Sequence, residues 1–94
     1  MIRKQSFFIL KSITRVMHFV YLVRCSDDSL YCGYTTNLKK RISIHNSKNG
    51  AKYTRSRTPV KLIYFEEFKT KSSALKREYQ IKQLSRREKQ KLFF

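Results

Sequence analysis

Glycine, proline, cysteine and acidic side chains are all scarce in this sequence. Its 94 residues include two glycines, one proline, two cysteines, no tryptophan and six aspartates and glutamates. So few glycines and prolines argue against a flexible linker between two domains. A chain of this length suits one domain with one modest core. No apolar run approaches the ~18 residues that cross a bilayer, so we expect no membrane-spanning segment.

The two cysteines, Cys25 and Cys32, flank a turn cluster over residues 26–29. A two-residue turn at Asp27-Asp28 would place Cys25 opposite Leu30. The same register would place Cys32 opposite Val23, which predicts no disulfide across the hairpin. Their spacing also lacks a zinc-binding pattern. We therefore expect two reduced thiols in a cytoplasmic protein.

Positive charge dominates the composition. Lysine and arginine total 22, and the formal net charge is +16. This field favours polyanions, because phosphate contacts release counterions. A hydrophobic content of 40% argues for a folded chain rather than a basic tail. We therefore predict a nucleic-acid partner. A generically basic surface is the plain alternative, and an anionic membrane is less favoured because no long basic amphipathic helix stands out.

Residues 1–17 stand apart as a basic segment without an acidic residue. Their apolar stretch, residues 7–10, is too short for a secretory signal peptide, whereas a transit peptide fits the lack of acids and stays open. We interpret residues 1–17 as an N-terminal extension, disordered or not native, with Met17 as an alternative start. Residues 18–94 then form the single domain.

Strand and helix patterns alternate along the rest of the chain. Aromatic and β-branched runs predict strands over 19–23, 30–34 and 60–68, the last with Val60, Leu62 and Tyr64 on one face. Helical spacing predicts helices over 37–46, capped by Thr35 or Thr36, and from Ser72 or Ser73 through 84; Ser85 and Glu88 form a capping box for a short last helix. The order β-β-α-β-α-α predicts an α+β fold, a small three-stranded mixed or antiparallel sheet with flanking helices.

Glu78 is unusual among the six acids because it shares an apolar helix stripe with Ala74 and Ile81. A carboxylate in that place needs a cation or hydrogen bonds. An ion pair with a lysine or arginine is the plain interpretation. The functional interpretation is a ligand for Mg²⁺, which takes one or two carboxylates and keeps several waters.

Arg41 and His45 lie one helical turn apart on the face that carries Leu38 and Ile42. A guanidinium can grip a phosphate bidentately. A histidine can orient a water or transfer a proton. A solvated basic helix edge is the plain alternative.

Tyr21 and Tyr31 are ten positions apart on the predicted hairpin. The register above would place Tyr31 opposite Arg24 and Tyr21 opposite Tyr34. Half-buried packing is the ordinary role of strand tyrosines. The functional alternative is a general base, since a nearby arginine and a metal would lower the phenol pKa from its usual ~10.

Taken together, these residues resemble the GIY-YIG nuclease superfamily. Residues 19–21, Phe-Val-Tyr, stand where the family has Gly-Ile-Tyr, and residues 31–33, Tyr-Cys-Gly, stand where it has Tyr-Ile-Gly. The helix that carries Arg41 and the later Glu78 follow in the family's order. The resemblance covers residues 18–84. It is closest to short single-domain bacterial proteins and more distant to the UvrC excision-repair nuclease module.

The resemblance implies a metal-dependent endonuclease that hydrolyses phosphodiester bonds in DNA, with branched, nicked or flap structures as candidate substrates. It implies that Tyr21 or Tyr31 activates or orients the attacking water. Arg41 would grip the phosphate, with His45 near the site. Glu78 would hold one Mg²⁺ or Mn²⁺.

Gly33 is implied to let the backbone approach the active surface closely, which suits a residue without a Cβ. Three positions depart from the family pattern: Phe19 replaces the first glycine, Tyr34 replaces a lysine common in repair relatives, and Gln90 stands near an expected asparagine. The alternative prediction is therefore a catalytically weak or inactive nucleic-acid-binding protein with this fold. An interaction module of a larger repair or ribosomal assembly is a third.

A basic loop predicted over residues 47–59 is the best candidate for holding nucleic acid. Its candidate contacts are Lys48, Lys52, Tyr53, Arg55 and Arg57. These side chains suit phosphates and one stacked base, although a solvated loop would show the same pattern. We predict DNA in preference to RNA, a monomer, no membrane association, a protein partner as one source of targeting, and the bacterial cytosol or nucleoid as location.

Overall fold

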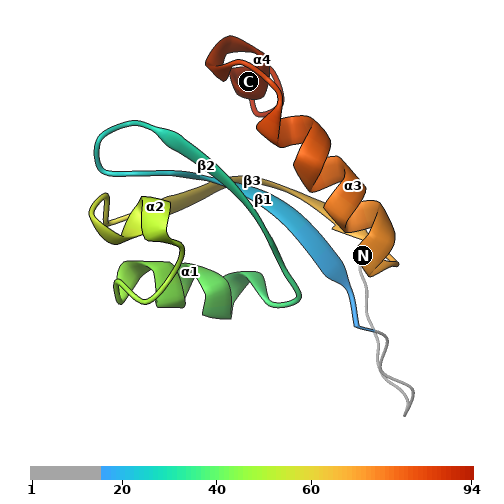
Figure 1. Cartoon of the computed structure of the whole chain (residues 1–94), viewed down its shortest axis with the longest axis horizontal. Coiled ribbons are helices and arrows are strands. Elements are labelled where there is room, and N and C mark those ends of the chain that lie inside the picture. The colour runs from blue at the N-terminus through green and yellow to red at the C-terminus, as the bar shows by residue number, and fades with distance from the viewer. Residues whose placement is uncertain (1–15) are drawn as a thin grey trace.

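The computed structural model describes residues 16–94, so most of the interpreted N-terminal extension lies outside the described residues. The elements are β1 (His18–Arg24), β2 (Leu30–Thr35), α1 (Leu38–Asn46), α2 (Lys52–Arg55), β3 (Lys61–Phe68), α3 (Lys71–Lys82) and α4 (Arg86–Gln90). Figure 1 shows α1 and α2 on one side of the sheet, with α3 and α4 on the other. The predicted α+β fold is confirmed. No helix within the described range has both the length and the apolar character to cross a membrane.

The sheet is antiparallel throughout, in the order β2-β1-β3. The central strand β1 is buried continuously from Val20 to Val23. This agrees with its position, because a strand between two others and between helices has no solvated face. The strand that carries Tyr21 therefore lies in the buried centre of the fold.

The register predicted for the β1–β2 hairpin is wrong by one residue. The expected two-residue turn is a three-residue loop, in which the Cys25 N–H donates to the Ser29 carbonyl at 2.9 Å. Asp28 adopts a φ of 69°, a left-handed conformation that aspartate tolerates better than most residues. This extra loop residue moves every cross-strand pair by one position.

The corrected register changes the partners of both motif tyrosines. Tyr21 lies opposite Gly33 rather than Tyr34. Tyr31 lies opposite Val23 rather than Arg24, and Cys32 lies opposite Leu22 rather than Val23. Both cysteine thiols are free and buried. The new register places a residue without a side chain directly against the Tyr21 ring.

A β-bulge interrupts the pairing of β3 with β1. Leu22 pairs with Tyr64, whereas the next residue, Val23, pairs with Leu62. The predicted single face for Val60, Leu62 and Tyr64 is therefore wrong, because a bulge re-aims the side chains that follow it. Val60 packs on the α1 side of the sheet and Tyr64 on the α3 side.

Each face of the sheet has its own apolar cluster. The cluster on the α3 side is formed by Val20, Leu22, Cys32, Ala74 and Ile81. The cluster on the α1 side is formed by Tyr21, Val23, Cys25 and Val60, with Leu38 and Ile42 packed against it. Alternation along β1 separates the two sets. Tyr21 consequently points toward α1.

Asn37 caps α1, rather than Thr35 or Thr36. Its side chain accepts a hydrogen bond from the Lys40 N–H at 3.0 Å. The cap fixes where α1 begins, and hence which side chains of α1 face the sheet.

The helices on the other side of the sheet also begin at side-chain caps. Thr70 caps α3, which runs from Lys71 to Lys82 rather than from Ser72 or Ser73 through 84. The predicted capping box of Ser85 and Glu88 is confirmed.

The segment over residues 47–59 is not the continuous loop that was predicted, because part of it is helical. It contains the short helix α2 and is tied to α1 by Asn46. The Asn46 side chain donates to the Val60 carbonyl at 3.2 Å and accepts from the Val60 N–H at 2.7 Å. These two bonds hold the segment against the end of α1, beside His45.

Candidate active site

The Tyr21 side chain is the buried centre of the site. It is 1% exposed and lies beneath α1, opposite Gly33 of the neighbouring strand. A Cβ added to Gly33 would collide with the Tyr21 hydroxyl and lie 3.0 Å from its Cε2. Gly33 has no positive φ, so the space for the Tyr21 ring, rather than backbone conformation, explains the glycine.

Two side chains of α1 meet the Tyr21 hydroxyl. Nε2 of His45 lies 2.7 Å from it, and Nε of Arg41 donates to it at 3.4 Å. Arg41 and His45 reach the same oxygen because residues four apart lie on one helix face. The structure therefore joins Tyr21 to Arg41 and His45, which the sequence had placed on one helix face without linking them to this tyrosine.

His45 has a second partner on the far side of its ring. Its Nδ1 lies 2.8 Å from Oγ1 of Thr54, whose hydroxyl contacts the Ala51 carbonyl at 3.0 Å. Thr54 is fully buried in α2. A Cβ on Gly50 would lie 2.9 Å from the His45 Cα, so this glycine lets the chain leading to α2 pass close to His45. Neither Gly50 nor Thr54 was predicted from the sequence as a residue of the site.

Burial controls the protonation of this pair. It raises the pKa of Tyr21 to about 12, against the opposing effect of Arg41. Burial, together with the nearby Arg41 charge, lowers the pKa of His45. Both groups are therefore neutral near pH 7. A neutral imidazole beside a neutral phenol leaves one ring nitrogen able to accept a proton.

Tyr31 forms the outer wall of the site on the edge strand β2. It is half-buried, and its ring meets the His45 ring edge-on with centroids 5.6 Å apart. It also stacks on Tyr53 at 5.8 Å with an interplanar angle of 23°. The ammonium group of Lys82 lies 5.8 Å from the centre of the Tyr31 ring. Tyr31 thus joins the α1 side of the sheet to the C-terminal end of α3.

Glu78 lies on the opposite side of the sheet from the Tyr21 hydroxyl. Its side chain is 18% exposed and forms an ion pair with Lys82 at 3.2 Å. Burial raises the pKa of Cys32 to about 12, with the Glu78 charge as the next cause. Cys32 is on the edge strand, so Glu78 approaches the same strand as Tyr31 from the α3 side. The ion pair expected as the plain interpretation of Glu78 is present.

The carboxylates do not gather into a multidentate metal site. Among residues 16–94, no group of three or more histidine, cysteine, aspartate or glutamate side chains is placed to hold one ion. Glu78 is linked to Tyr31 through Lys82, which pairs with Glu78 and lies over the Tyr31 ring. A single hard carboxylate oxygen still fits Mg²⁺, which can bind through one carboxylate and retain its waters.

The predicted nucleic-acid contacts divide into two groups. Lys48, Lys52 and Arg55 are exposed, with Lys48 at a φ of 67° and Arg55 donating to the Gly50 carbonyl at 3.2 Å. Tyr53 and Arg57, in contrast, contact each other. The Arg57 guanidinium lies 4.0 Å from the centre of the Tyr53 ring and donates to the Tyr53 carbonyl at 2.7 Å.

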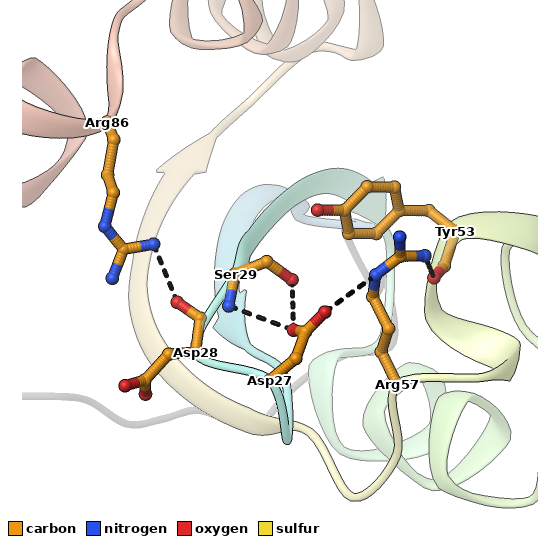
Figure 2. A network of polar contacts seen from close by, with 6 residues as sticks. All are labelled: Asp27, Asp28, Ser29, Tyr53, Arg57 and Arg86. Carbon is orange, nitrogen blue, oxygen red and sulfur yellow. Dashed lines mark hydrogen bonds and ion pairs between the residues drawn. The ribbon is translucent and has the colours of Figure 1, made fainter.

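Arg57 also holds the loop between β1 and β2, as Figure 2 shows. Its Nε donates to Asp27 at 3.0 Å, while Arg86 of α4 donates to the Asp28 carbonyl at 2.7 Å. Two arginines from distant parts of the chain thus anchor this loop. The structure gives Arg57 an anchoring contact that differs from the free phosphate contact expected for it.

The structure therefore assembles one compact group from the predicted site residues: Tyr21, Tyr31, Gly33, Arg41 and His45. Glu78 lies outside the hydrogen bonds that connect this group, and it pairs with Lys82 instead. Gly50 had one available signal, as one of only two glycines in the chain, placed just beyond His45. Thr54 carried no comparable signal, because its importance depends on α2 folding back against α1.

Comparison with known proteins matches this chain to a family model described as the GIY-YIG catalytic domain, over residues 17–91. A UPF0213 protein from Haloquadratum walsbyi is 57% identical over 75 residues, which cover 80% of this chain and 84% of the relative. A UPF0213 protein from Halobacterium salinarum is 56% identical over 82% of this chain and 100% of the relative.

Solved structures give the same fold. The solution NMR structure of the UPF0213 protein BH0048 from Bacillus halodurans is 47% identical, with a TM-score of 0.53 and 81% of each chain covered. That of the protein EF2693 from E. faecalis is 44% identical, with a TM-score of 0.56 and 80% of each chain covered.

Proposed function

The chain belongs to the GIY-YIG catalytic domain family, and we propose that it is a metal-dependent endonuclease that hydrolyses phosphodiester bonds in DNA. The family membership implies an endonuclease-type function acting on nucleic acid. The preference for DNA, the divalent ion and the roles of individual residues are our proposals. The proposed proton transfer depends chiefly on the hydrogen-bonded group of Tyr21, His45 and Arg41.

The contact that carries the proposal is the 2.7 Å pair between the Tyr21 hydroxyl and His45 Nε2. A phenol with a raised pKa is a poor base when it acts alone. A phenol that can pass its own proton to an adjacent imidazole can accept another without first becoming a free phenolate. The Tyr21–His45 pair therefore suits the removal of a proton from an attacking water.

The proposed step is the hydrolysis of a phosphodiester bond by one water molecule. The water oxygen forms a bond to phosphorus, its proton moves to the Tyr21 oxygen, and the Tyr21 proton moves to His45 Nε2. The P–O bond to the leaving oxygen breaks, and that oxygen takes a proton from solvent. His45 ends the step as an imidazolium and returns its proton to solvent afterwards.

Arg41 is proposed to exchange its contact with Tyr21 for a contact with the scissile phosphate. Its bond to the Tyr21 oxygen is long, at 3.4 Å, and its side chain is only half-buried. A guanidinium that turned toward a phosphate would pair with the charge that develops there. It would also leave a place beside the Tyr21 oxygen for the water. Tyr31, on the accessible edge, would orient that water.

Glu78 is proposed to hold one Mg²⁺ or Mn²⁺ at the edge strand, with water as the remaining ligands. When bound, the ion would supply Lewis-acid stabilisation of charge on the phosphate and on the attacking or leaving oxygen. The Glu78–Lys82 ion pair would open to admit the ion. The exposed side chains of Lys48, Lys52 and Arg55 would contact flanking phosphates.

A cleavage assay tests this proposal directly. Labelled single-stranded, duplex, nicked and branched DNA would be incubated with the protein in Mg²⁺, Mn²⁺ or EDTA. We expect metal-dependent products that disappear in Arg41→Ala and in Glu78→Gln. Matched controls are Arg87→Ala and Glu67→Gln, which alter exposed side chains of the same types. Cleavage that survives both site substitutions would refute the site assignment.

A non-catalytic nucleic-acid-binding protein is the second candidate function. The observation that favours it is the Glu78–Lys82 ion pair, which already neutralises the only carboxylate proposed for the metal. Tight, salt-sensitive binding to all four DNA structures without products in any metal would establish this alternative.

A further inference from the structure

The hydrogen bonds around Tyr21 fix which ring nitrogen of His45 carries the proton. Within residues 16–94, the Tyr21 hydroxyl contacts two hydrogen-bonding groups, Arg41 Nε and His45 Nε2. A guanidinium only donates hydrogen bonds. The phenol proton of this buried side chain therefore needs His45 Nε2 as its acceptor. His45 Nε2 must then be unprotonated, and the neutral imidazole carries its proton on Nδ1.

The hydrogen bonds around Thr54 lead independently to the same tautomer. The Thr54 hydroxyl has a single proton, which it donates to the Ala51 carbonyl at 3.0 Å. The hydroxyl oxygen can then only accept at Nδ1 of His45, 2.8 Å away. A proton on Nδ1 satisfies this contact. All the hydrogen bonds therefore run in one direction, from Arg41 through Tyr21 to His45 on one side, and from His45 through Thr54 to Ala51 on the other.

We infer that Thr54 is a positioning residue: by accepting the Nδ1 proton of His45, it holds His45 Nε2 as the proton acceptor for Tyr21. Without this hydroxyl, a proton on Nδ1 would lose its acceptor, and only the contact with Tyr21 would still oppose the Nε2 tautomer. That tautomer presents a donor to the Tyr21 oxygen, which then has no acceptor for its own proton and cannot pass it on. The wrong tautomer of a catalytic histidine disables it even when the geometry is retained.

This role rests on the proposed function, but its first test is independent of cleavage. Long-range ¹⁵N–¹H NMR spectra distinguish the two neutral tautomers of an imidazole. The chain has two histidines, so a His18→Gln variant assigns the signals of His45. We expect the wild-type chain to carry the His45 proton on Nδ1. A proton on Nε2 in the wild-type chain would overturn the inference, whether or not any variant folds.

Substitutions at Thr54 then separate positioning from packing. Thr54→Val keeps the shape of the side chain and removes the hydroxyl, and we expect it to shift His45 toward the Nε2 tautomer. Thr54→Ser restores the hydroxyl and should restore the Nδ1 tautomer. Thr36→Val, at an exposed position before α1, is the control. A folded Thr54→Val variant with an unchanged His45 tautomer would overturn the inference.

Cleavage completes the test. We expect Thr54→Val to lose on the order of 10²-fold in rate, the low end of what a positioned acid or base contributes, and Thr54→Ser to recover most of it. A full rate in Thr54→Val with a shifted tautomer would refute the catalytic consequence. If the wild-type chain cleaves no substrate, the proposed function fails, while the NMR spectra still decide the role of Thr54.

Discussion

The Tyr21 hydroxyl lies 2.7 Å from Nε2 of His45, and this contact joins the central strand to α1. The chain has a second pair of the same kind on the other face of the sheet. There, the Tyr34 hydroxyl lies 2.8 Å from Nδ1 of His18, with the two rings stacked at 15°. The second pair is partly exposed and is not connected to Arg41 or Thr54. The Tyr34–His18 pair can therefore serve as the control when the role of the Tyr21–His45 contact is tested by substitution.

Replacing Tyr21 with phenylalanine should abolish cleavage and weaken the fold. The substitution removes the phenol that is proposed to relay the proton, and it leaves the buried His45 Nε2 without a donor. We expect the rate to fall by at least ~10²-fold. We expect the free energy of unfolding, measured with urea, to fall by about 1–3 kcal/mol.

Tyr34→Phe is the matched control, because it removes the same hydroxyl from the other tyrosine–histidine pair. We expect its cleavage rate to stay near the wild-type value. Equal losses of activity in the two variants would show that the Tyr21 hydroxyl has no special role in the chemistry.

Gly33→Ala should displace the Tyr21 hydroxyl. The new Cβ would collide with that hydroxyl, and Tyr21 cannot withdraw because its ring is buried beneath α1. We expect the free energy of unfolding to fall by about 1–3 kcal/mol, as in other overpacked sites, and cleavage to fall with it.

A double-mutant cycle with Tyr21→Phe checks the cause of this loss. Removing the hydroxyl removes part of the clash. The sum of the losses of unfolding free energy in the two single variants should therefore exceed the loss in the double variant. Strict additivity would place the strain of Gly33→Ala elsewhere in the sheet.

The sequence predicted the fold class and the shared helix face of Arg41 and His45, because both depended on local patterns. Runs of aromatic and β-branched residues identified the strands, and residues four apart on a helix share a face, which correctly paired Arg41 with His45. The prediction failed where one loop residue decided the outcome. Asp28 adopts a left-handed conformation that most residue types disfavour. The extra loop residue that results places Tyr21 opposite Gly33 rather than opposite Tyr34.

The contacts of Thr54 and Arg57 could not be predicted for a different reason. Thr54 reaches His45 only because Gly50 permits close packing and Asn46 ties the segment to Val60. Arg57 reaches Asp27 across 30 positions of the chain. Such contacts depend on the final packing of segments rather than on the periodicity within any of them.

The stability of the fold should fall between neutral pH and pH 5 because of His45. Burial lowers the pKa of His45 in the folded chain, so the unfolded chain binds more protons as the pH falls below ~6.5. The stabilisation is complete above the unfolded pKa and is lost as the pH falls toward the folded pKa. The slope cannot exceed about 1.4 kcal/mol per pH unit, the value for one proton.

Urea unfolding at pH 7.5, 6.5, 5.5 and 5 measures this slope. His45→Gln should be less stable at every pH but should lack most of the slope, whereas His18→Gln should retain it. The carboxyl groups of Asp27, Glu66 and Glu88 have lowered pKa values, so their effects belong below this range. A slope that persists in His45→Gln would assign the titration to another group.

Lys52 and Arg57 should differ in their contributions to DNA binding, although both belong to the same basic segment. Lys52 is exposed, whereas the Arg57 guanidinium is engaged by Asp27 and the Tyr53 carbonyl. A free lysine that contacts a phosphate releases about one counterion. Lys52→Ala should therefore reduce the salt dependence of binding, log K against log [salt], by about one unit.

Arg57→Ala should leave that slope unchanged and lower the free energy of unfolding by about 1 kcal/mol or less, since its ion pair is partly exposed. Both variants would be titrated with duplex and single-stranded DNA in EDTA, so that binding is measured without cleavage. Asp27→Asn, which removes the charge of the partner, should resemble Arg57→Ala in stability. A reduced salt slope in Arg57→Ala, with stability intact, would show that Arg57 leaves Asp27 to contact the phosphate backbone.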